Sequence, residues 1–268
     1  MNIPFKSSLI TGIFLMSTQL SHAALITPDI TISGFAEFDT TSLPFSGTGS
    51  QNGEIKSVLG GTTATTIITD VTPAGANPQG GLFSMTGDGV GASAVAMGDA
   101  FDLMEDFFFS FSFDLANSSG VDDYMISFGI DFSNTVDADG ADAYVDSEIV
   151  LEDTAGELFF SDVTSDAAFG DEKNGTALAT SGAAISDSGL FDFDVTLLAG
   201  GMYSFDGFLK MDGGEFDGGA FSADSTAFIY IKEITKLGAP VSVPTPATML
   251  LFLTGSLGLL TRKYFTKK

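Results

Sequence analysis

The sequence contains no cysteine and no tryptophan, and its 268 residues include a single histidine, His22. Without cysteine, disulfide bonds and thiolate chemistry are excluded. Residues 24–239 also lack histidine and arginine, which excludes Ser-His-Asp and Cys-His catalysis, typical zinc sites and the usual neutral-pH general base. We therefore predict that the protein is not an enzyme. The hydrolase that this composition still permits would be a secreted one that works with carboxylates alone.

Positive charge is scarce in the long middle of the chain. All 35 acidic residues lie between residues 24 and 239, where the only basic residues are Lys56, Lys173, Lys210, Lys232 and Lys236. Such a surface repels phosphate backbones, so nucleic acid is excluded as a partner. The same charge attracts divalent cations and keeps the region soluble.

The first 23 residues have the three parts of a secretory signal peptide in the required order. Lys6 gives the start a positive charge, an apolar run spans residues 9–16, and Ser21-His22-Ala23 supplies small residues for the peptidase. We predict cleavage by signal peptidase after Ala23. Residues 24–239 then form one acidic domain, long enough to bury a sizeable core.

Residues 240–268 form a second terminal signal. Their apolar stretch, 247–261, is shorter than the roughly 20 residues of a spanning helix, and Arg262 and Lys263 follow it directly as a membrane stop. Because positive charge stays on the cytoplasmic side, the acidic domain is expected outside.

Val243-Pro244-Thr245-Pro246, the short apolar stretch and Arg262-Lys263 occur in that order at the end of the chain. This tail resembles the PEP-CTERM sorting signal of Gram-negative bacteria, with Thr245 where the motif usually has glutamate. The resemblance implies transient passage through the inner membrane, processing by an exosortase near Pro244, and delivery to the cell surface or an exopolysaccharide matrix. The other interpretation of the tail is an ordinary single-span anchor.

The middle of the chain alternates apolar and polar residues with a period of two, which is typical of strands with one buried face. Phe109, Phe111 and Phe113, for example, alternate with serines. We predict about ten to twelve short strands in an antiparallel, jelly-roll-like β-sandwich. The absence of a repeat of 20–50 residues counts against a solenoid. The only helix candidate, 99–106, is short.

Two finer predictions concern the connections between strands. Segments 107–115 and 124–132 flank a turn at 117–120 and are predicted to pair as a hairpin. The glycine-rich triplets 212–214 and 217–219 are predicted turns.

Asp137, Asp139, Asp142 and Glu148 lie within a twelve-residue span of the kind that binds calcium in an EF-hand. The first, third and twelfth positions carry carboxylates, but the sixth is Asp142 where glycine is required, and the flanking segments are predicted strands. The span therefore predicts either a looser calcium site in a strand-connecting loop or a solvated acidic loop.

These features favour an exported surface or matrix protein with a structural or adhesive role. The alternative is a carbohydrate- or calcium-dependent binding module, which aromatic side chains exposed on one sheet face would indicate.

Overall fold

The computed structural model describes residues 23–179 and 184–238, and in these ranges the chain forms strands and connecting segments without any helix. No helix that could cross a bilayer is therefore present in the described residues. The predicted signal peptide up to His22, the apolar stretch 247–261 and the rest of the C-terminal signal lie outside them. The strands are β1 (Ile30–Phe38), β2 (Ser50–Leu59), β3 (Thr62–Thr69), β4 (Thr72–Ala74), β5 (Gln79–Leu82), β6 (Gly89–Asp99), β7 (Leu103–Asn117), β8 (Asp123–Asp139), β9 (Ala143–Asp153), β10 (Gly156–Asp166), β11 (Glu172–Lys173), β12 (Thr176–Ala177), β13 (Ile185–Leu197), β14 (Met202–Glu215) and β15 (Ala220–Leu237).

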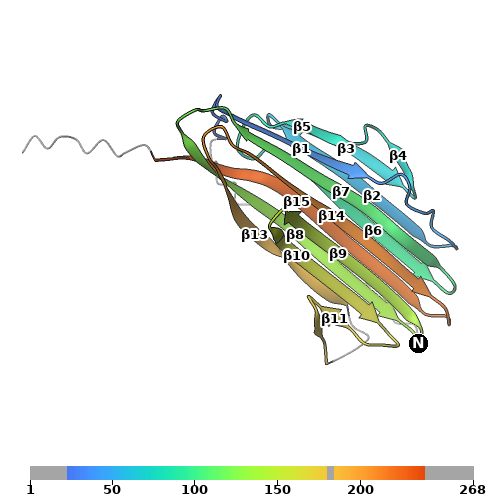
Figure 1. The fold of residues 1–268 in the computed structure, drawn as a ribbon. Helices are drawn as coiled ribbons and strands as arrows, with labels where there is room; N and C mark the ends of the chain where they lie inside the picture. The colour runs from blue at the N-terminus through green and yellow to red at the C-terminus, as the bar shows by residue number, and fades with distance from the viewer. Residues whose placement is uncertain (1–22, 180–183, 239–268) are drawn as a thin grey trace, which may run out of the picture.

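The strands form two antiparallel sheets that lie one over the other (Figure 1). The first sheet has the order β12-β11-β10-β9-β14-β7-β1-β5, and the second has the order β13-β8-β15-β6-β2-β3-β4. The prediction of an all-β, antiparallel two-sheet architecture is confirmed.

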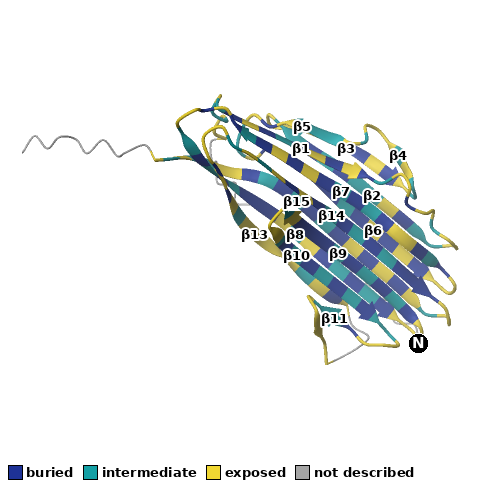
Figure 2. Ribbon diagram, viewed as in Figure 1, coloured by how far each residue is buried: buried dark blue, intermediate teal, exposed yellow. Residues whose placement is uncertain are grey.

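A phenylalanine-rich core fills the space between the sheets. Burial alternates along long strands such as β7 and β9, and Figure 2 shows the resulting chequered colouring. Phe113 of β7 stacks on Phe205 of β14 with ring centroids 4.4 Å apart, and it meets Phe128 of the second sheet edge-on at 6.1 Å. Each such ring contributes about 2–3 kcal/mol through burial. The period-two pattern of the sequence therefore specifies which side chains face inward.

The predicted hairpin between segments 107–115 and 124–132 is wrong, although both segments are strands. β7 belongs to the first sheet and β8 to the second, so the connection crosses between sheets. The Asn117 side-chain amide fixes this crossing by donating to the carbonyl oxygens of Asp122 at 2.7 Å and Leu198 at 3.0 Å. The two apolar strand faces bury each other across the sandwich, which adjacent strands in one sheet would not do.

The helix candidate at 99–106 is also wrong. The buried carboxylate of Asp102 accepts hydrogen bonds from the backbone N–H groups of Thr48 at 2.8 Å and Asp99 at 2.9 Å. These bonds hold a tight turn, after which β7 starts at Leu103. Because the Asp102 carboxylate closes this turn and β7 begins at the next residue, the segment does not continue as a helix.

One of the two predicted glycine turns is correct. Residues 217–219 connect β14 to β15, and the buried Glu215 carboxylate accepts from the backbone N–H groups of Asp217 and Gly218 at 2.8 and 2.9 Å. Burial raises the pKa of the Glu215 carboxyl, but the hydrogen bonds from backbone N–H groups outweigh burial and lower this pKa to about 2. Residues 212–214 instead lie inside β14, where a Cβ on Gly213 would stand 3.0 Å from the Phe221 ring. That glycine makes room for a core aromatic rather than a turn.

Candidate functional site

The structure does not bring the four predicted calcium ligands together. Asp137 lies in β8 on the outer face of the second sheet, whereas Glu148 lies in β9 on the outer face of the first sheet. Asp139 and Asp142 are exposed where the chain crosses between these strands. Within residues 23–179 and 184–238, no group of three or more acidic side chains has a geometry that could hold a metal ion.

Asp137 and Asp139 instead border an open hollow of about 590 Å³ on the second sheet. Asp99 of β6 and Phe221 of β15 line it as well. The hollow therefore lies where the ends of the neighbouring strands β6, β8 and β15 meet, and three aspartates give it a strong negative charge.

Glu148 belongs to an acidic group that the sequence analysis missed. On the outer face of the first sheet, Glu148 of β9 lies directly opposite Asp162 of β10, and Asp146 of β9 lies opposite Asp212 of β14. We call these four residues the acidic face. The alternation of acidic and apolar residues in β9 is visible in the sequence. That Asp162 and Asp212 lie opposite Glu148 and Asp146 follows only from the strand register. Like charges placed opposite one another in a sheet are destabilising.

Three carboxyls of the acidic face, those of Glu148, Asp162 and Asp212, have a raised pKa and hold their protons more tightly than ordinary carboxyls do. Burial, reinforced by the charges of Asp146 and Glu148, raises the pKa of Asp162 to about 7. Burial and the Asp146 charge raise the pKa of Asp212 to about 6. The pKa of Glu148 is raised by the same two causes. Some of these carboxyls are therefore protonated near neutral pH and can donate as well as accept hydrogen bonds.

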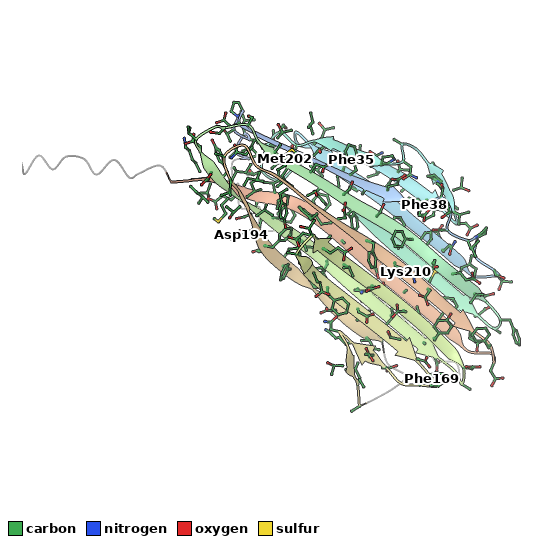
Figure 3. All side chains as sticks on the ribbon, viewed as in Figure 1. Phe35, Phe38, Phe169, Asp194, Met202 and Lys210 are labelled. Atoms are coloured by element: carbon green, nitrogen blue, oxygen red, sulfur yellow. The ribbon has the colours of Figure 1, made fainter. Side chains whose placement is uncertain are left out.

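Lys210 of β14 supplies the positive charge beside the acidic face (Figure 3). Its ammonium group lies 2.7 Å from the Asp106 carboxylate and 3.7 Å from that of Asp212. The hydrogen bond with Asp106 raises the pKa of Lys210, so the lysine stays charged.

Two aromatic rings adjoin Lys210 on the same outer face. Phe108 of β7 lies opposite Lys210 in register, and its ring stacks on that of Phe208 with centroids 5.5 Å apart and planes 24° apart. An open hollow of about 300 Å³ lies between Phe108, Lys210 and Asp106 on one side and the 39–43 segment on the other. We call it the aromatic hollow.

The second sheet carries a comparable but smaller feature. Phe228 and Tyr230 of β15 lie with ring centroids 6.0 Å apart, and the Lys56 ammonium is 5.3 Å from the Phe228 centroid. A hollow of about 230 Å³ adjoins Phe228. Aromatic side chains therefore reach the outer faces of both sheets.

The predicted processing residues fall mainly outside the described ranges. Ala23 is exposed at the start of the described chain. The tail residues lie beyond its end at residue 238, and they are Val243, Pro244, Thr245, Pro246, Arg262 and Lys263.

No family model matches the chain, and no curated protein matches it. Among solved structures, the chain is similar to "Structure of infectious bursal disease virus Gt strain" at 11% identity and a TM-score of 0.14, covering 91% of this chain and 78% of that chain. It is likewise similar to the Gx strain structure of that virus at 12% identity and a TM-score of 0.13, covering 91% and 79%. TM-scores this low carry no argument about fold or function.

Proposed function

We propose that the chain is an exported, exosortase-sorted protein of the cell surface or the exopolysaccharide matrix, with a structural or adhesive role. The observation that carries the proposal is that residues 23–179 and 184–238 form a sandwich of strands with acidic outer faces and open hollows. The sequence patterns of residues 1–23 and 240–268, which we interpret as signals, support it. A surface of this charge stays soluble and hydrated.

In this proposal, residues 1–23 are a signal peptide and residues 240–268 are the sorting signal, with 247–261 as a short membrane helix. Signal peptidase and exosortase are the partners during processing. The proposal includes a jelly-roll-like topology for the sandwich, and the passages of the chain from one sheet to the other at β7–β8 and β8–β9 support it. A catalytic role has no support in the composition, since residues 24–239 lack histidine, cysteine and arginine.

A second candidate is a carbohydrate-binding module. The stacked pair of Phe108 and Phe208 beside Lys210 favours it, because an aromatic platform with adjoining polar groups suits sugar rings. The predicted calcium ligands give no support to a calcium-dependent form of this module, because the structure does not bring Asp137 and Glu148 together.

The sorting proposal is tested by where the protein accumulates in its host. We expect wild type in the surface or matrix fraction and the double variant Pro244→Ala/Pro246→Ala retained in the inner-membrane fraction. Prolines keep a segment extended and non-helical, which a processing enzyme can grip. Pro240→Ala is the matched control, because it removes a proline of the same tail outside the motif. Equal distribution of wild type and double variant would contradict the proposal.

A further inference from the structure

The 39–43 segment forms one wall of the aromatic hollow, and hydrogen bonds hold it at both ends. The buried Gln51 side-chain amide donates to the Leu43 carbonyl oxygen and to an Asp70 carboxylate oxygen, both at 2.9 Å. At the other end of the wall, the Asp39 N–H donates to the Phe108 carbonyl oxygen at 3.0 Å. A wall held at both ends loses little entropy when a ligand binds.

Phe108 and Leu43 supply the apolar part of the lining of the hollow. Phe108 is half-buried, and stacking on Phe208 fixes its orientation. The face of an aromatic ring is electron-rich, so it attracts the weakly positive C–H groups on one side of a pyranose ring.

The rim offers both donors and acceptors. Lys210 donates and the carboxylates of Asp39 and Asp106 accept. The Thr41 hydroxyl donates to Asp39 at 2.8 Å, so it offers the hollow an acceptor. Sugar hydroxyls need such a mixed set, because each one both donates and accepts. The rim has more carboxylates than lysines, and Asp212 lies only 3.7 Å from Lys210. The surplus negative charge repels uronate and sulfate groups, which selects for neutral sugars.

We propose that the aromatic hollow binds one ring of a neutral polysaccharide, with Phe108 as the stacking platform and Lys210, Asp106 and Asp39 as hydroxyl partners. A volume of about 300 Å³ lies at the lower end for ligand sites, which fits a single ring of a longer chain. This inference deepens the proposed function by naming the class of matrix component that the domain contacts.

The test uses the full-length protein in mild detergent, run on native gels that contain dextran, laminarin or galactomannan as neutral probes. Gels with polygalacturonate serve as the anionic comparison. We expect at least one neutral polysaccharide to retard the protein and polygalacturonate to leave its mobility unchanged.

Phe108→Ala and Lys210→Met should each weaken that retardation by about tenfold or more. Lys210→Met removes a partly exposed side chain and keeps the fold testable if Phe108→Ala melts early. Phe228→Ala is the matched control, because it removes an aromatic ring from the outer face of the other sheet. It should leave the binding to the neutral probe unchanged.

Three results would overturn the inference: no retardation by any neutral probe, unchanged binding of the folded Phe108→Ala and Lys210→Met variants, or equal loss with Phe228→Ala. The gel assay needs neither export nor tail processing. Failure here therefore leaves the sorting proposal standing, and failure of sorting leaves this inference standing.

Discussion

The hydroxyl oxygens of Ser147 and Ser225 lie 2.6 Å apart in the core, although the two residues belong to different sheets. Asn134 completes the contact: its side-chain oxygen accepts from the Ser225 hydroxyl at 2.7 Å, and its amide donates to the Ser147 carbonyl oxygen at 2.7 Å. All three side chains are fully buried. A buried polar network of this kind fixes how one sheet sits on the other.

Replacing Asn134 should therefore destabilise the fold strongly. Asn134→Ala leaves the Ser147 carbonyl and the Ser225 hydroxyl without these partners and opens a small cavity. We expect a loss of about 2–4 kcal/mol in the free energy of unfolding, measured by urea denaturation. The neighbouring Ser133→Ala, on the exposed face of the same strand, should stay within about 0.5 kcal/mol. A loss below about 0.5 kcal/mol for Asn134→Ala would show that the network is not needed for stability.

The close approach of β14 and β9 gives a second stability test. A Cβ on Gly207 would lie 2.2 Å from Leu151 Cδ2 and 2.4 Å from the Val150 carbonyl oxygen. Gly207→Ala should cost about 1–3 kcal/mol through overpacking, seen as a lower melting temperature. Gly120→Ala is the control, because a Cβ there meets nothing within 4 Å. Equal melting temperatures for the two variants would contradict the strand packing described above.

The acidic face predicts an unusual pH dependence. The pKa of Asp162 is about 7 in the folded chain, above its ordinary value of 3.8, so between these values the folded state binds more protons than the unfolded chain. Stability should therefore be greatest near pH 4 and fall as the pH rises to 7. Asp212, with a pKa of about 6, acts in the same direction.

Asp162→Asn should flatten this pH profile and raise stability at pH 7.5 by about 1–2 kcal/mol. That is less than the roughly 4 kcal/mol of a full three-unit shift, because Asp162 is partly exposed. Denaturation curves from pH 4.5 to 8 give the measurement. Asp114→Asn is the control, because the residues opposite Asp114 on the two neighbouring strands are Ser33 and Ser204 rather than acids. This variant should leave the slope of the profile unchanged. The same slope in wild type and Asp162→Asn would refute the assignment.

Calcium binding by the four predicted ligands can be checked directly. Because Asp137 and Glu148 lie on opposite outer faces, we expect melting curves with calcium and with a chelator to coincide. A melting temperature several degrees higher with calcium, abolished by Asp137→Asn together with Glu148→Gln, would contradict this placement of the residues.

The sequence was sufficient to predict where strands lie and which face each one buries, but not which strands pair with one another. Alternating phenylalanines in β7 and alternating aromatic and aliphatic residues in β8 show which face each strand buries. The pattern is the same, however, whether the partner lies beside the strand or across the core. The pairing of β7 and β8 with strands of different sheets distinguishes the two arrangements. The Asn117 contact to Leu198, which supports the crossing, joins residues far apart in the chain.

The acidic face and the aromatic hollow were unpredictable for the same reason. Asp146 and Glu148 stand out in the sequence, but Asp162 and Asp212 join them through the register of β10 and β14. Likewise, the 39–43 segment reaches Phe108 through the pairing of β1 with β7 and the hydrogen bond from the Asp39 N–H to the Phe108 carbonyl oxygen. Long-range pairing decides both features, and the composition alone suggested only that acids would gather somewhere.

The most direct test of the account is the mass of the protein found outside the cell. Intact-mass and terminal-peptide analysis of the surface or matrix fraction should give a chain that begins at Ala24 and ends at or before Thr245. A native chain that carries both Met1 and Lys268 and remains in the cytosol would contradict the proposal of an exported and sorted protein.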